Sequence, residues 1–233
     1  MPRSYLAKDE TRAGKVRQLF DTIAPHYDRI NNLQSLGLHH RWKRRLVQLA
    51  DIQPGQRALD LCCGTGDIAR RLAACGAQVT AIDFSEPMLQ IARDKGPSEI
   101  QYIKGDALDT AQPDNHFHAV TIAYGLRNLA DFHAGLREMH RLTRPGGRLC
   151  ILDFGKPPSP LIRFWYEGYL KWVVPRLGQA LAKDAPAYAY IHESLEDYPA
   201  QAGTATALEE LHCQQIKTQN LLLGTMSITT AVK

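Results

Sequence analysis

The stretch Leu59-Asp60-Leu61-Cys62-Cys63-Gly64-Thr65-Gly66-Asp67 decides the fold, because an apolar run passes through two glycines straight into a helical pattern. The flanking residues predict a strand over 57–62 and a helix over 67–74. Glycines at such a turn let the backbone bend sharply and approach a ligand closely. A dinucleotide site would require a third glycine, in the spacing G-x-G-x-x-G, and that third glycine is missing here. The stretch therefore predicts a ligand-binding turn without naming the ligand.

Short apolar runs alternate with helical patterns on both sides of this stretch. This alternation predicts a Rossmann-like α/β fold: a seven-stranded, mostly parallel sheet with helices on both faces and an antiparallel pair at one edge. The expected strands are 57–62, 78–83, 100–104, 117–123, 148–154, 214–219 and 225–232. The expected helices of the core are 67–74, 86–94, 131–142 and 206–211.

The length of 233 residues predicts a single domain, 1–233, with two helical additions. One is an N-terminal lid over about 1–50, broken near Pro25 and continued by a helix over 39–50. The other is a substrate-side insertion over about 156–200. No apolar run approaches the ~18 residues of a membrane span, and the polar start Met1–Glu10 lacks a signal core, so we expect a cytoplasmic protein.

Acidic residues follow two further predicted strands. Asp83 ends the strand after the glycines, where a carboxylate can accept hydrogen bonds from both hydroxyls of a ribose. Asp106 follows the next strand and can accept from an adenine amino group. Each acid alone has another interpretation, because such residues often cap helices or make turns. Together with Gly64 and Gly66 they predict a nucleoside-type cofactor.

The same residues resemble the successive motifs of class I S-adenosylmethionine methyltransferases. The matching segments are 60–67, Asp83, Asp106-Ala107 and 144–148. The resemblance implies S-adenosylmethionine as cofactor and S-adenosylhomocysteine as product. It implies that Gly64, Thr65 and Gly66 wrap the methionine part, that Asp83 holds the ribose, that Phe84 and Met88 enclose the adenine, and that Asp106 and Ala107 read its edge. Asp60, Ala123 and Tyr27 complete the expected cofactor site.

A narrower resemblance covers about 16–232, to the ubiquinone/menaquinone biosynthesis C-methyltransferases. It rests on Tyr27-Asp28-Arg29-Ile30-Asn31-Asn32 followed by Ser35, His39 or His40, and Trp42, on Gly125-Leu126-Arg127-Asn128, and on Leu152-Asp153-Phe154. Asp153 and Gly155 stand where the family usually has Glu and Ser, and Ala123 stands where members often carry Ser. The resemblance implies C-methylation of a prenylated quinol, with demethylmenaquinol to menaquinol favoured over a benzoquinol. The alternative is another small aromatic or lipid substrate.

Three residues are the expected catalytic set. Arg127 would stabilise the phenolate that develops on the ring, Asn128 would orient the same oxygen, and Asp153 would meet the substrate headgroup. The opposing interpretation makes Arg127 a structural partner of an acid or a helix end, and Asp153 a loop cap. His39 is either a proton shuttle or a structural histidine, and Tyr27 belongs to the lid.

Charge and aromatic residues suggest the partners. Residues 1–50 carry ten Lys/Arg against four Asp/Glu, densest at 41–45, which indicates either an anionic partner or a solvated helix face. Aromatic residues at helical spacing over 164–172 indicate either core packing or peripheral contact with the inner face of a membrane. We find no RNA-binding module and expect no nucleic-acid partner. Five cysteines without zinc spacing predict neither disulfides nor a metal site. A homodimer stays open.

Overall fold

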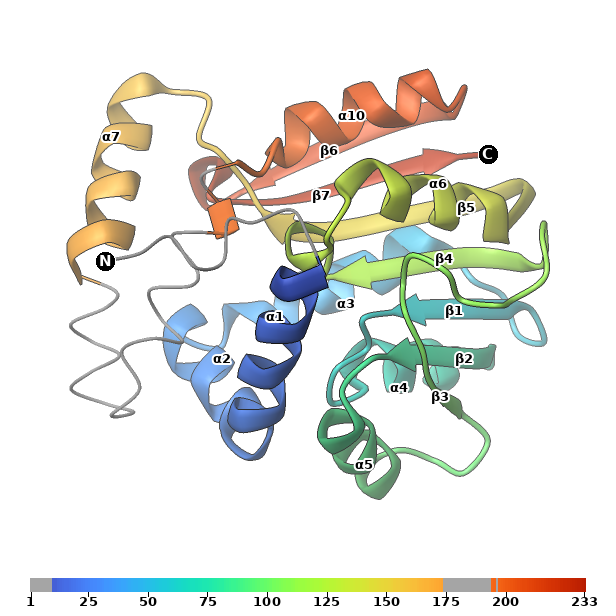
Figure 1. The fold of residues 1–233 in the computed structure, drawn as a ribbon. Helices are drawn as coiled ribbons and strands as arrows, with labels where there is room; N and C mark the ends of the chain where they lie inside the picture. The colour runs from blue at the N-terminus through green and yellow to red at the C-terminus, as the bar shows by residue number, and fades with distance from the viewer. Residues whose placement is uncertain (1–9, 174–193, 196) are drawn as a thin grey trace.

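A seven-stranded sheet in the order β3-β2-β1-β4-β5-β7-β6 forms the centre of the computed structural model (Figure 1). The structure describes residues 10–173, 194–195 and 197–233. The first five strands run parallel, and β7 pairs antiparallel with both β5 and β6. The predicted fold class is therefore confirmed. The strands are β1 (Arg57–Leu61), β2 (Gln78–Asp83), β3 (Gln101–Lys104), β4 (Phe117–Ala123), β5 (Thr143–Phe154), β6 (Gln214–Leu221) and β7 (Met226–Val232).

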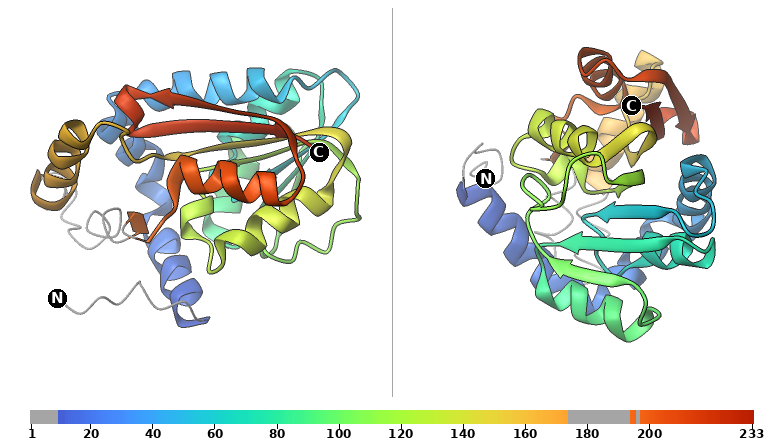
Figure 2. Two further views of the ribbon diagram at one scale, coloured as in Figure 1. Left: turned by 90° about the horizontal axis from the view of Figure 1, so that it is seen from above. Right: turned by 90° about the vertical axis from the view of Figure 1, so that its right-hand side faces the viewer.

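Each face of the sheet buries its own apolar core, because neighbouring residues of a strand point to opposite faces. Leu59 of β1 packs with α6 (Phe132–Leu142) and α10 (Ala200–Glu210). Ala58 packs on the other side with α3 (Leu38–Ala50), α4 (Asp67–Ala74) and α5 (Glu86–Lys95). Figure 2 shows α3 and α10 on opposite sides of the sheet. Because both faces are covered, the central strands are apolar almost throughout.

The strand order creates the crevice in which α/β folds bind ligands. The chain proceeds from β1 through β2 to β3 on one side and then returns to place β4 on the other side of β1. Helices after β1 and β4 therefore diverge, and the crevice opens at the carboxyl ends of these strands. The N-terminal helices α1 (Glu10–Ile23) and α2 (Tyr27–Ser35) lie at this end (Figure 1). A short 3-10 turn over Ala24–His26 joins them, at the predicted break near Pro25.

Two predicted boundaries are wrong. The helix expected over 206–211 begins at Ala200, six residues earlier. Its first turn holds Gly203, whose missing side chain leaves room for Pro199, because a Cβ there would lie 2.1 Å from that ring. A glycine and small polar residues conceal the helical periodicity. The strand expected over 148–154 begins at Thr143, before a register shift against β4 between Phe117 and Ala119.

The predicted insertion over 156–200 is described only in part. It begins with α7 (Pro160–Gly168) and continues as a π-helical turn, η3 (Tyr169–Val173). The predictions for residues 174–193 and 196 lie outside the described residues, as do those for 1–9. Within the described chain, no helix combines the length and apolarity needed to cross a bilayer.

Candidate active site

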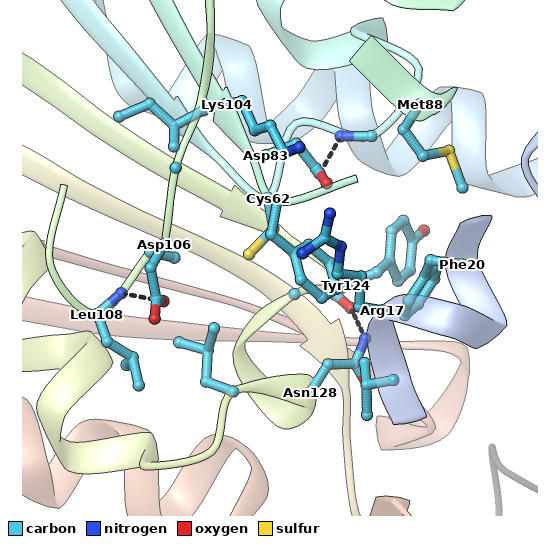
Figure 3. A pocket seen from close by; sticks show the side chains of 18 of the residues that line it. Arg17, Phe20, Cys62, Asp83, Met88, Lys104, Asp106, Leu108, Tyr124 and Asn128 are labelled. Atoms are coloured by element: carbon cyan, nitrogen blue, oxygen red, sulfur yellow. Dashed lines mark hydrogen bonds between the residues drawn. The ribbon is translucent and has the colours of Figure 1, made fainter. Parts of the chain in front are cut away.

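A first cavity of about 400 Å³ lies at the carboxyl ends of β1, β2, β3 and β4, beneath α1 and α2 (Figure 3). Its walls come from four successive strand ends and from the N-terminal helices, so the fold brings together residues more than 100 positions apart. Eight of the predicted cofactor-binding residues line it: Tyr27, Gly64, Asp83, Phe84, Met88, Asp106, Ala107 and Ala123.

Asp83 is the most constrained polar group of this cavity. Its Oδ2 accepts a hydrogen bond from the Gly64 N–H at 2.8 Å, and its Oδ1 accepts one from the Ser85 N–H at 2.9 Å. Burial raises the pKa of this carboxyl to about 6, against the opposing effect of the backbone donors. Each carboxylate oxygen has a further acceptor site. Asp83 therefore presents two aligned acceptors to a ligand while its orientation is fixed by the glycine turn.

The backbone of the turn after β1 favours glycine at position 64. Gly64 has a φ of +53°, in the left-handed region, and the nearest atom to a Cβ built on it would be Tyr27 Cε1 at 3.8 Å. Cys62 and Tyr124, which follow β1 and β4, are also left-handed, with φ of +52° and +61°. Non-glycine residues in this region carry strain and are frequent at functional sites. Gly125 must be glycine for another reason, because its Cβ would lie 2.6 Å from Cys62 Cβ.

The N-terminal helices are hydrogen-bonded to the loops that follow β1 and β2, which we call the cofactor loops. Asp28 of α2 accepts from the Thr65 hydroxyl at 2.8 Å and from the Lys95 ammonium at 2.6 Å. The Ser85 hydroxyl donates to Asp21 of α1 at 2.6 Å. These contacts hold α1 and α2 beside the first cavity.

Three residues of the predicted cofactor site are not among the residues that line the cavity: Asp60, Thr65 and Gly66. Asp60 is buried in the middle of the sheet, where its Oδ1 accepts from the Thr121 hydroxyl at 2.8 Å. Burial raises the pKa of Asp60 to about 7. The Thr65 hydroxyl donates to Asp28 of α2, and Gly66 packs beneath Tyr102 and Ala92. These residues shape the turn from below.

A second cavity of about 450 Å³ adjoins the first. Phe20, Tyr27 and Tyr124 line both cavities and so form the wall between them. Most of the other lining residues are apolar or aromatic, including Ile23, Leu38, Trp42, Phe154, Tyr166 and Met226. The second cavity therefore suits a ring with a hydrocarbon substituent, placed against the ligand of the first.

Arg127 brings a positive charge to the second cavity. Its Nη1 donates to Asp153 Oδ1 at 3.1 Å and to the Tyr124 carbonyl at 2.5 Å, and its guanidinium lies 4.7 Å from the centre of the Phe154 ring. Asp153 is 1% exposed and lines neither cavity. Burial raises the pKa of Asp153, and Arg127 opposes that rise. Asn128 lines the first cavity and donates to the Tyr124 carbonyl at 2.9 Å.

His39 lines the second cavity as a neutral ring. The Ser35 hydroxyl donates its proton to the Asn31 carbonyl at 2.7 Å, so it accepts from His39 Nδ1–H, also at 2.7 Å. Burial, together with the nearby Lys43 ammonium, lowers the pKa of His39 to about 4. A ring of such low basicity is a poor proton acceptor at neutral pH, which favours the bracing role over the shuttle.

A cluster beside this ring has the composition of a metal site. His39, His40 and Asp67 offer ligand atoms within 4.8 Å of one another. The Lys43 ammonium, however, donates to Asp67 Oδ2 at 2.9 Å, so a positive charge already occupies this carboxylate.

Sequence reasoning did not assign Phe20 and Tyr124 to the site. Phe20 belongs to the apolar face of α1, and helical spacing alone predicts only that such a face is covered. Tyr124 directly follows the predicted strand over 117–123, and Asp83 ends the predicted strand over 78–83. Position at a strand end was therefore the signal that could have identified Tyr124 as a site residue. Both side chains appear beside the cavity in Figure 3.

Comparison with known proteins gives one family over nearly the whole chain. The model of the ubiE/COQ5 methyltransferase family matches residues 7–233. A demethylmenaquinone methyltransferase of Mycobacterium sp. (strain KMS) is 40% identical over 219 residues, which cover 94% of both chains. A ubiquinone/menaquinone biosynthesis C-methyltransferase of Legionella pneumophila (strain Paris) is 35% identical, over 94% of this chain and 91% of that one.

Solved structures agree on the fold. A S-adenosylmethionine-dependent methyltransferase of Thermotoga maritima, described as a possible histamine N-methyltransferase, superposes with a TM-score of 0.68. It is 16% identical and is matched over 94% of this chain and 99% of its own. A phosphoethanolamine N-methyltransferase of Haemonchus contortus has a TM-score of 0.64, at 16% identity, over 83% of this chain and 52% of its own.

Proposed function

This chain belongs to the ubiE/COQ5 methyltransferase family, and we propose that it transfers a methyl group from S-adenosylmethionine to a ring carbon of a prenylated quinol. Demethylmenaquinol, converted to menaquinol, is the substrate we favour. Relatives at 35–40% identity carry names for this reaction and for its ubiquinone counterpart. The observation that carries the proposal is the pair of adjoining cavities, one polar at its strand ends and one apolar.

The residues of the first cavity fit S-adenosylmethionine. Asp83 offers two oriented acceptors for a ribose, and Phe84 and Met88 offer apolar surface for an adenine. Gly64 leaves open space where any other residue would place a Cβ. When bound, the cofactor supplies an electrophilic methyl on a sulfonium. The enzyme then contributes mainly alignment, which can account for a large share of a displacement rate.

The residues of the second cavity fit the quinol ring. A hydroquinone carbon becomes nucleophilic when the neighbouring hydroxyl loses its proton. Arg127 lines this cavity and would stabilise the resulting oxyanion, while Asp153 fixes the guanidinium and Asn128 fixes the loop through Tyr124. Asp153 is in this account a positioning residue, because its contacts run through Arg127. The apolar walls exclude water from the reacting carbon.

The lid and the cellular location belong to the same proposal. Asp21 and Asp28 tie α1 and α2 to the cofactor loops, so we propose that these helices open for exchange of cofactor and product within a single domain. A long prenyl tail resides in a bilayer. We therefore propose a cytoplasmic enzyme that contacts the inner face of the membrane peripherally.

A product assay tests the reaction. The enzyme is incubated with cofactor carrying a trideuterated methyl and with a panel of demethylated naphthoquinols, demethylated benzoquinols and small phenols. We expect transfer to a ring carbon, fastest with the naphthoquinol, seen as a mass gain that boron tribromide, a reagent that cleaves aryl methyl ethers, does not remove. Transfer to a small phenol but to none of the quinols would favour the alternative, another small aromatic or lipid substrate.

A further inference from the structure

The second cavity opens through an apolar rim. Leu36, Tyr169 and Leu222 line the cavity, yet they are 85%, 44% and 52% exposed. Further exposed apolar side chains come from the same elements or their neighbours. We call the whole set the apolar rim: Leu33 and Leu36 of α2 and its C-terminal cap, Leu161, Phe164 and Trp165 of α7, Tyr169 and Trp172 of η3, and Leu222 and Leu223 of the β6–β7 turn.

Three leucines of the apolar rim occupy backbone positions that favour glycine. Leu36, Leu222 and Leu223 have φ of +49°, +43° and +59°. A left-handed leucine costs strain, and these leucines, which are 52–85% exposed, recover little of that cost by burial within the chain. Glycine or asparagine would serve each turn better. Neither the strained backbone nor the exposed apolar side chain stabilises the fold. We therefore take these side chains to make a contact outside the folded chain.

Two contacts join the part of the apolar rim on α7 to the part on the β6–β7 turn. The Tyr166 hydroxyl donates to the Thr225 carbonyl at 3.4 Å, which joins α7 to the β6–β7 turn. Gly224 of that turn packs on the Pro157-Pro158 segment, where a Cβ would lie 2.8 Å from Pro158 Cδ. α7, the β6–β7 turn and α2 all lie at the left-hand end of the molecule in Figure 1, α7 above and α2 below. The two contacts thus place α7 and the β6–β7 turn side by side at the cavity.

We propose that the apolar rim inserts into one leaflet of a lipid bilayer, so that the prenyl tail passes from the bilayer into the second cavity without crossing water. This inference rests on the proposed function, because the tail decides the occupant: a protein seated on the rim would close the mouth through which the tail must pass. Exposed aromatic residues with a neighbouring cation are typical of the membrane interface, and Lys171 lies 5.5 Å from the centre of the Trp172 ring.

Vesicle binding tests the proposal without any turnover. Full-length protein is sedimented with vesicles of phosphatidylcholine alone and of phosphatidylcholine with phosphatidylglycerol, neither containing quinone. The variant combines Trp165→Gln with Leu223→Gly; neither residue lines a cavity, and glycine suits the backbone at 223. We expect partitioning about tenfold weaker than in the wild type, with an unchanged melting temperature.

His212→Gly is the matched control. His212 is also left-handed, with a φ of +59°, and precedes β6 while Leu222 follows it, so the two turns lie at opposite ends of an eight-residue strand. This variant should partition like the wild type. A wild type that binds neither vesicle, or a combined variant that binds as well as the wild type, would overturn the proposal. A wild-type dimer that the combined variant converts to monomer would also overturn it, by assigning the rim to a second copy.

Turnover then separates this inference from the proposed function. With a quinol of one isoprene unit presented in solution, the combined variant should match the wild type. With a long-chain quinol presented in vesicles, it should be about tenfold slower. Loss of vesicle binding with equal activity on both substrates would refute delivery through the rim while leaving quinol methylation intact.

Discussion

Replacing Asp83 by asparagine should weaken cofactor binding more than any other single change at the first cavity. The carboxylate accepts from the N–H groups of Gly64 and Ser85, one on each oxygen. An amide nitrogen in place of either oxygen would face a backbone donor with donors of its own. It would also remove one of the two acceptors that we assign to the ribose hydroxyls.

The magnitude follows from those contacts. A hydrogen bond to a charged group contributes about 1.5–3 kcal/mol, and the new donor–donor contact distorts the glycine turn as well. A loss of about 2–4 kcal/mol corresponds to a dissociation constant raised roughly 30- to 700-fold.

The pH dependence provides a second signature. Burial raises the pKa of Asp83 to about 6, and only the ionised form accepts from both hydroxyls. Near pH 7 about nine-tenths of the free enzyme carries this charge, and near pH 5 about one-tenth does, so affinity should fall about tenfold between them. The sign is that of a raised carboxyl pKa: binding is lost as the pH drops through 6.

Isothermal calorimetry with S-adenosylhomocysteine measures both effects. The wild type should show the weakening toward pH 5, and Asp83→Asn should show weak binding at every pH, without that slope. Asp94→Asn, at an exposed acid of α5 that lines neither cavity, is the control and should bind normally. An Asp83→Asn affinity within threefold of the wild type would refute the assignment of the ribose to this carboxylate.

Three further predictions follow from the packing. Arg127→Lys should keep cofactor affinity within threefold in calorimetry but lower kcat at least ~100-fold, because an ammonium cannot reproduce the planar fork of the guanidinium. Arg127→Ala should in addition lower the free energy of unfolding by about 3–5 kcal/mol, because it removes the ion-pair partner of Asp153. Normal turnover in Arg127→Lys would exclude the proposed role of Arg127. Gly125→Ala should cost about 1–3 kcal/mol in urea unfolding by pressing on Cys62, and adding Cys62→Gly should restore most of that loss, so an unrescued double variant would contradict the packing argument. Asp60 has a pKa of about 7 in the folded protein, above that of an unfolded chain, so the native state binds more protons than the unfolded state. The free energy of unfolding should therefore fall by up to about 4 kcal/mol as the pH rises from 4 to 7. Asp60→Asn should flatten this slope in thermal unfolding, and an unchanged slope would assign it to other groups.

The strand ends of this protein can be predicted from the sequence because each apolar run stops at a residue with a distinct conformational or chemical preference. Gly64 and Asp83 mark two such ends, and the structure places both on one cavity. Parallel strands bring their carboxyl ends to the same edge, so position along each strand was enough to group them. The antiparallel pair β7 and β6 was predictable for the same reason, since only a short turn separates the two runs.

The sequence does not predict in the same way which side chains line a cavity or how deeply they are buried. Asp60 stands one residue before Leu61 on a central strand, and only the flanking strands β2 and β4 bury it below the cavity. Arg127 could be expected to pair with an acid, but its partner Asp153 lies 26 positions away and meets it only because β5 pairs with β4. Phe20 is likewise ordinary in its helix, and becomes part of the wall between the two cavities through the docking of α1.

A crystal structure with S-adenosylhomocysteine and a short-chain naphthoquinone would test most directly whether two ligands meet across the wall of Phe20, Tyr27 and Tyr124. We expect the ribose on Asp83 and the sulfur facing that wall. We expect the quinone ring beyond the wall, with one oxygen toward Arg127 and the tail leaving past Leu222. A quinone bound elsewhere, or an adenosyl group that does not touch Asp83, would contradict this arrangement.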